Sequence, residues 1–163
     1  MRRLFGLGAA LTFALAVAGG ATARGPTNQF AVGSAKTDMT LISDVEHASF
    51  SAHNTVGGSC RATGQIVYQS PVASFTANIV ELVIMGHTAF FGGPITQAGR
   101  GVTVGTSAYF DVSDSGMPGG TGDGFVFEGV NNAPPAFPLC LPPFPGHPLT
   151  SGNVVINATG LLP

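Results

Sequence analysis

The sequence predicts a secreted all-β domain, an antiparallel meander of about eight strands that forms a small closed or partly open β-barrel. Short runs rich in β-branched and aromatic residues recur along the chain, and Gly, Pro, Asn or Asp stands between them. Charged residues make up only 9% of the chain, which contains 24 Gly and 12 Pro. Short connections favour neighbouring antiparallel strands, and such a meander removes its edges by closing. A two-sheet β-sandwich is the alternative.

Residues 1–23 have the three parts of a secretory signal peptide. A basic start, Met1-Arg2-Arg3, precedes an uncharged, mostly apolar stretch at 4–18 and the cleavage signal Ala21-Thr22-Ala23. Of the 163 residues, removal of these 23 leaves 140, so we expect one secreted domain at 24–163. No later apolar run has the length of a membrane span, so we expect a soluble extracellular product.

The charge of the mature chain argues against two classes of partner. Six Lys and Arg less Arg2 and Arg3 leave four, against eight Asp and Glu, which gives a net charge of −4. Nucleic acids and anionic membranes require concentrated Lys and Arg, so neither partner is expected.

Each expected strand is a β-rich run that ends at a turn signal. The strands are, in order, 28–36, 47–53, 60–69, 73–85, 87–97, 102–112, 124–130 and 152–158. The breaks at 54–58, 70–71, 86, 97–101 and 113–124 are turn-like because Gly permits positive φ and Pro fixes φ.

The segment 132–148 interrupts this pattern. Seven of its seventeen residues are Pro, and it carries the apolar side chains Phe137, Leu139, Leu141 and Phe144. We expect a long, extended, Pro-rich loop whose apolar side chains cover an end or an edge of the sheet.

The two cysteines, Cys60 and Cys140, predict a disulfide. Paired cysteines in an exported chain are usually oxidised. The bond would tie the Pro-rich loop to the sheet and contribute on the order of 3 to 4 kcal/mol. The alternative is a nucleophilic Cys60 with His53 nearby, which requires a free thiol.

Glu81 is an unexpected carboxylate inside an apolar strand. On simple alternation it shares a face with Ile79 and Val83, yet the other face is also apolar, so the pattern does not separate inside from outside. If Glu81 points into the barrel, burial should raise its pKa or require a partner, and the carboxyl would contact a ligand or act as an acid. Otherwise it pairs with Arg61 or Arg100, or reaches solvent near a barrel mouth.

Calcium is the one metal for which the sequence offers candidate ligands. Asp111, Asp114 and Asp123 flank the Gly-rich loop 115–124, and calcium prefers carboxylate and carbonyl oxygens. The alternative is that these side chains bond local backbone N–H groups. The four histidines do not form a zinc pattern, because the closest pair, His47 and His53, is about 20 Å apart along a strand. No other cofactor is expected.

Several runs taken together resemble a group of small secreted bacterial domains known as post-COAP. They begin at Phe50, Ala77, Val112 and Leu149, and read FSAH, ANIVELVIMGHTAFFGG, VSDSGMPGGTGDGFVF and LTSGNVVI. The resemblance implies an all-β extracellular domain without an established activity and supplies no catalytic residues. In that group Cys commonly stands where this chain has Glu81. A hairpin centred on residues 70–71 would place Cys60 directly opposite Glu81.

Three functions are compatible with these features. The favoured one is a non-enzymatic binding or surface-interaction module, which holds a small apolar ligand or docks an extracellular protein through the loop around 137–144. An enzyme of the cyclase or isomerase type would use Glu81 with His53 or Tyr109 on a hydrophobic substrate in the lumen. A structural cell-envelope protein is the third. Six aromatic residues on successive strands would either fill the lumen or line a pocket in it: Phe30, Phe50, Phe75, Phe90, Phe110 and Phe125.

Overall fold

The computed structural model describes residues 29–39, 44–54, 60–117, 122–131 and 140–158; the predicted signal peptide lies outside these residues. The described residues form nine β-strands and no helix. The strands are β1 (Phe30–Met39), β2 (Asp44–Asn54), β3 (Arg61–Gln69), β4 (Ser74–Met85), β5 (Thr88–Ala98), β6 (Ser107–Ser113), β7 (Gly124–Asn131), β8 (His147–Pro148) and β9 (Ser151–Asn157).

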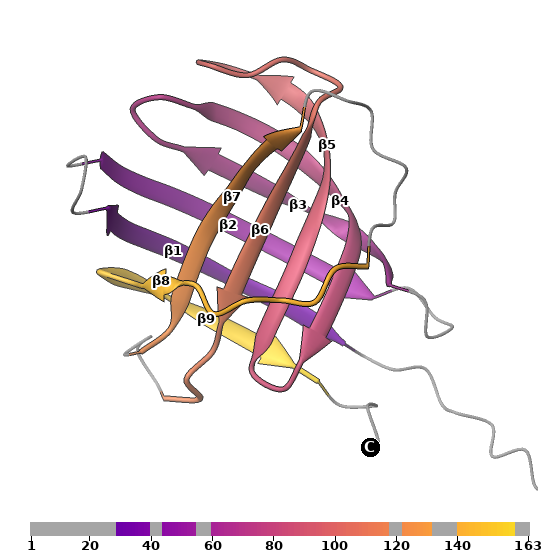
Figure 1. Ribbon diagram of the computed structural model, residues 1–163, viewed down its shortest axis with the longest axis vertical. Helices are drawn as coiled ribbons and strands as arrows, with labels where there is room; N and C mark the ends of the chain where they lie inside the picture. Colours follow the sequence, from indigo (N-terminus) through magenta and orange to yellow (C-terminus); the bar gives the residue numbers. More distant parts are fainter. Residues whose placement is uncertain (1–28, 40–43, 55–59, 118–121, 132–139, 159–163) are drawn as a thin grey trace, which may run out of the picture.

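All nine strands belong to one sheet, in the order β8-β7-β6-β5-β4-β3-β2-β1-β9. The first seven form the predicted meander, and every pairing is antiparallel. The sheet curls strongly into a half-barrel, with β4 to β7 in front of β1 to β3 in Figure 1. Because the strands are continuous across one sheet, the barrel prediction is confirmed and the two-sheet sandwich is excluded.

The observed strands differ from the expectation most at the start of β6 and by one added strand. The strand expected from residue 102 begins at Ser107, because the backbone N–H of Gly105 and the carbonyl of Thr106 bond back to Ile95 and form a turn. The ninth strand, β8, is a two-residue pairing of the Pro-rich segment with β7 that no local pattern indicates.

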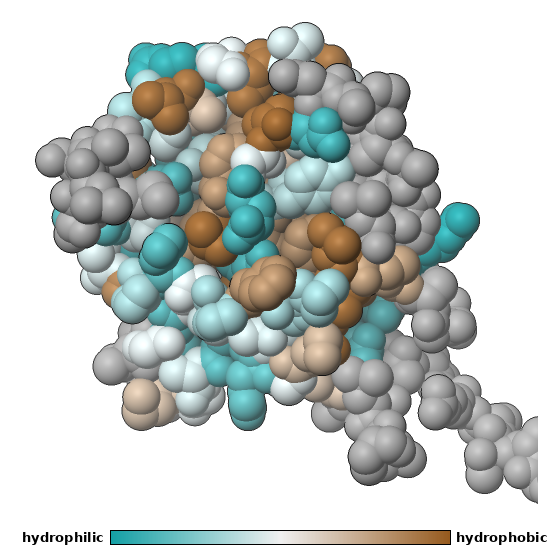
Figure 2. All heavy atoms as spheres, in the orientation of Figure 1, coloured by the Kyte–Doolittle hydropathy of each residue, from teal (hydrophilic) through white to brown (hydrophobic). Residues whose placement is uncertain are grey.

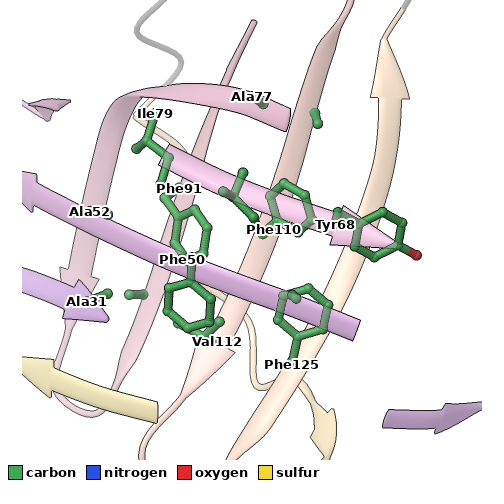
Figure 3. Close-up of a cluster of buried hydrophobic side chains, with 14 of the residues drawn as sticks. Ala31, Phe50, Ala52, Tyr68, Ala77, Ile79, Phe91, Phe110, Val112 and Phe125 are labelled. Atoms are coloured by element: carbon green, nitrogen blue, oxygen red, sulfur yellow. The ribbon is translucent and has the colours of Figure 1, made fainter. Parts of the chain in front are cut away.

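The inside of the half-barrel is filled by aromatic side chains. Phe110 lies at its centre, with ring centroids 5.2 to 6.1 Å from those of five neighbours. Figure 3 shows Phe50, Phe91 and Phe125 gathered in the same cluster. Four of the six expected aromatics, Phe50, Phe75, Phe110 and Phe125, belong to this core. The lumen is therefore a packed core, since rings from opposite sides of the sheet meet across it.

The alternation of β4 changes phase between Ile79 and Leu82. Before this point Ala77 and Ile79 face the core, and beyond it Leu82 and Ile84 do. The pairings of β4 with β3 and with β5 both shift register there, which marks a β-bulge. The bulge turns Glu81 to the outer face, so simple alternation, which put it with Ile79, was wrong.

The open edge of β9 is bridged by carboxylates. This strand pairs only with β1, and its Val154 and Ile156 N–H groups donate to Asp123 Oδ2 at 2.7 Å and Asp114 Oδ2 at 2.9 Å. Both aspartates flank the loop between β6 and β7. These side-chain hydrogen bonds therefore connect β9, next to β1, with the β6–β7 loop at the other end of the meander, where no strand pairing among the described residues joins them.

Candidate functional site

A segment without regular structure, residues 140–146, crosses the outer face of the sheet; we call it the strap. In Figure 1 it runs, orange to yellow, in front of β4, β5 and β6 before it joins β8. The predicted disulfide between Cys60 and Cys140 is present, with 5.6 Å between the two Cα atoms, and fixes one end of the strap. Its backbone donates two hydrogen bonds to the sheet, from Cys140 N to Glu81 Oε2 at 3.2 Å and from Phe144 N to Asp111 Oδ1 at 2.9 Å.

Beneath the strap, Glu81, Gly92 and Tyr109 occupy one cross-strand row on β4, β5 and β6. A Cβ atom on Gly92 would lie 2.8 Å from Tyr109 Cδ1 and 3.3 Å from Glu81 Oε1, so glycine makes the space that these two side chains occupy. Phe90 lies beside them and stacks on Tyr109 with ring centroids 6.0 Å apart. Burial raises the pKa of Tyr109 above its usual 10; the Ser107 hydroxyl lowers it and the Glu81 charge raises it.

Asp111 and Glu128 form a second acidic pair on this face. Asp111, on β6, is 1% exposed, and its Oδ2 has no hydrogen-bond partner among the described residues. Glu128 is exposed and stands at a register shift of β7, where Tyr109 pairs with Gly129 and Phe110 with Phe127. Burial raises the pKa of Asp111 to about 6; the Phe144 N–H lowers it and the Glu128 carboxyl raises it.

The three predicted ligand-binding residues divide into two groups. Glu81 and Tyr109 come together, but on the outer face, under the strap and away from the lumen. His53 does not join them, since it lies exposed on β2, where its Nε2 is 2.9 Å from Ser51 Oγ and its ring is next to Phe30. Cys60, in a disulfide, is not a nucleophile.

Glu81 lies opposite Arg61 in the strand register, and Arg61 is one of the partners proposed for it from the sequence. It is fully buried, so it does not reach solvent, and it does not enter the lumen. The prediction that Cys60 lies directly opposite Glu81 is wrong by one position, because Arg61 pairs with Glu81 in the register. Arg100 is elsewhere, with its guanidinium donating to the Pro71 carbonyl at 2.5 Å.

The structure does not gather the three predicted calcium ligands. Asp123 Oδ1 accepts from the N–H and hydroxyl of Ser115, Asp114 Oδ1 accepts from Gly116 N, and both Oδ2 atoms accept from β9. Asp111 lies apart, under the strap. In the described part of the chain, no three His, Cys, Asp or Glu side chains converge as a metal site. The aspartates thus bond backbone N–H groups, locally and across the barrel opening.

Sequence reasoning missed two acidic residues, Glu46 and Glu128. Glu46 points into the half-barrel, where its carboxylate accepts from the Tyr68 hydroxyl at 2.7 Å and from Thr37 Oγ1 at 3.4 Å. The sequence pattern does indicate that Glu46 faces inward, because Glu46 shares the period-two alternation of Ala48 and Phe50. No sequence pattern indicates the orientation of Glu128, because a β-bulge sets it.

Two open pockets lie away from the strap. One, of about 550 Å³, is lined by Val45, His47, Gln69, Ser70, Pro71 and Arg100. The other, of about 270 Å³, is lined by parts of β3, β4 and β5 that include Tyr68 and Phe75. Neither is lined by Glu81, His53 or Tyr109.

No family model, curated protein or solved structure matches this chain. A search of the described residues for a helix long and apolar enough to cross a membrane finds none. The resemblance to post-COAP domains therefore stays a prediction.

Proposed function

We propose that this protein is a secreted, non-enzymatic interaction module that presents the strap to an extracellular protein partner. The observation that carries the proposal is an apolar segment whose side chains are exposed while its backbone is held. Leu141 is 45% and Phe144 is 62% exposed, whereas the strap is tied to the sheet by one disulfide and two hydrogen bonds to buried carboxylates.

Such an arrangement lowers the entropic cost of binding. The strap sequence Leu-Pro-Pro-Phe-Pro has fixed φ angles at its three prolines and forms no internal strand or helix. Figure 2 shows apolar residues, in brown, interspersed with polar residues on the face of the molecule that the strap crosses in Figure 1. A partner with an aromatic-lined groove for extended Pro-rich segments has the matching chemistry.

The filled lumen supports this proposal over the two alternatives that need a cavity. A carrier of small apolar ligands and a lumen enzyme both require space where Phe50, Phe91 and Phe110 meet. Secretion is part of the proposal and is supported by the disulfide, which persists in oxidising compartments.

Site-specific photo-crosslinking tests this function. A benzoylphenylalanine in place of Phe144, in the full chain secreted by its own producing cells, should give one discrete adduct. Excess unlabelled wild-type protein should compete for the adduct, and excess Phe144→Ser protein should not. The matched control is the same label at Val67, which is 50% exposed on β3, near the end of that strand opposite Cys60.

Two results would refute the proposal. One is a lack of specificity: the adduct forms equally from positions 144 and 67, or excess Phe144→Ser protein competes for it as well as wild-type protein does. The other is a large loss of folding stability in Phe144→Ser, which would make the side chain a structural cover; for an exposed side chain we expect a change within about 0.5 kcal/mol.

A further inference from the structure

We propose that Asp111 and Glu128 share a proton and that this proton closes the strap, so that the strap is held in mildly acidic media and loosens at neutral pH. The proposal concerns the regulation of the surface assigned above. Its consequence for partner binding rests on the proposed function, whereas the closing of the strap does not.

The geometry leaves one position for a proton. Asp111 Oδ1 receives the Phe144 N–H, but Oδ2 is buried without a hydrogen-bond donor among the described residues, and the neighbouring ionisable group is the carboxyl of Glu128. An ionised Asp111 would bury an unsatisfied oxygen beside a like charge, which is unfavourable. A protonated Asp111 donates from Oδ2 to Glu128 and still accepts from Phe144.

The bulge of β7 is a second, independent indication. An extra residue between Phe127 and Gly129 shifts the pairing with β6, and that residue is Glu128. Bulges often aim a side chain at a functional place. Here the bulge places the Glu128 carboxyl beside the buried carboxyl of Asp111.

The surroundings of Asp111 contain few other groups that titrate. On β6 itself Tyr109 is the neighbour, with a raised pKa; β7 contributes Glu128; residues 88–98 of β5 carry no ionisable side chain. On β4, Glu81 accepts a hydrogen bond from Cys140 N, at the other end of the strap. The strap and β8 contribute His147, which lies at the β8 end, paired with Phe125.

The direction of the pH effect follows from the pKa of Asp111. In the closed strap it is about 6, above the usual 3.8, so closure takes up a proton and is favoured as the pH falls through this interval. A released strap would expose Asp111 and return its pKa toward the usual value. The opening equilibrium should therefore rise about tenfold between pH 5 and pH 7.5.

Amide hydrogen exchange at Phe144 in the full-length mature protein measures this equilibrium directly. After correction for the intrinsic exchange rate, exchange should be about tenfold faster at pH 7.5 than at pH 5, with chelator present so that no divalent cation replaces the proton. Asp111→Asn keeps an oxygen acceptor and replaces the proton-bearing oxygen with an NH₂ donor. It should show slow exchange at both pH values. Glu128→Gln, at an exposed position, should reduce the pH dependence and leave the fold intact.

The proposal is overturned if Phe144 exchange in Asp111→Asn follows pH as in wild type, or if protection in wild type increases toward pH 7.5. It is also overturned if the carboxyl ¹³C resonance of Asp111 titrates near 3.8. Crosslinking from position 144 that fails while exchange behaves as expected would refute the interaction function and leave the pH-dependent closure standing.

Discussion

The carboxylate of Glu81 accepts a hydrogen bond from the backbone N–H of Cys140, 59 residues further along the chain. The cysteine itself is bonded to Cys60, beside Arg61, the cross-strand neighbour of Glu81. One buried carboxylate and one disulfide therefore fasten the same end of the strap. This contact explains why an acidic residue interrupts an apolar strand.

Removal of the Glu81 carboxylate should destabilise the fold. Glu81→Ala removes the acceptor of the Cys140 N–H and a fully buried side chain, and loss of a hydrogen bond to a charged group costs about 1.5 to 3 kcal/mol. Glu81→Gln, which keeps the length and an acceptor oxygen, should lose less. Urea unfolding of the oxidised proteins measures both, and an Ala variant as stable as wild type would contradict the role of this contact.

A methyl group at Gly92 should disturb the row beneath the strap. The new Cβ would lie 2.8 Å from Tyr109 Cδ1 and 2.9 Å from the Ala108 carbonyl oxygen, distances that force a shift. We expect Gly92→Ala to cost about 1 to 3 kcal/mol, as overpacking does. A thermal midpoint unchanged from wild type would show that the Tyr109 ring moves freely aside.

The carboxylate of Asp123 should be needed to hold β9. It accepts from Ser115 N, Ser115 Oγ and Val154 N, and an amide has only one acceptor oxygen. Asp123→Asn should therefore cost about 2 to 4 kcal/mol and increase amide exchange at Val154. The matched control is Asp38→Asn on the exposed side of β1, expected within about 0.5 kcal/mol of wild type. Equal effects of the two substitutions would refute a specific bridge.

The disulfide should contribute a substantial part of the stability. Cys60 and Cys140 are separated by 80 residues, and closing a loop of this size restricts the unfolded chain by about 4 kcal/mol. A Cys60→Ser, Cys140→Ser double variant should unfold at correspondingly lower denaturant concentration. An unchanged midpoint would mean that the strap is held by its hydrogen bonds alone.

The pH dependence of global stability should carry the signature of Asp111. Its folded pKa of about 6 lies above the usual 3.8, so its contribution is fully present below about pH 4 and is lost as the pH rises through 6. The upper limit is about 3 kcal/mol, from two pKa units. Comparison of wild type with Asp111→Asn at pH 4 and pH 7.5 isolates this contribution, and a difference that does not vary with pH would contradict it.

Local patterns were sufficient for the strands and the hairpins. Period-two alternation and the turn residues between strands predicted eight of the nine strands, as at Gly86, whose φ of 61° closes the hairpin between Met85 and Thr88. The disulfide followed from having two cysteines in a chain with an export signal. Two of the three candidate ligand residues, Glu81 and Tyr109, also lie in one cross-strand row.

The sequence by itself thus determined an all-β meander and one disulfide, because these depend on period, turn chemistry and residue count. Only the tertiary structure decided which face carries Glu81 and Glu128, because one extra residue in a bulge reverses the face and leaves no local signal. It also decided that Glu81, Tyr109 and Asp111 are buried on the outer face. That burial results from a segment far along the chain, bonded to carboxylates whose partners are non-local.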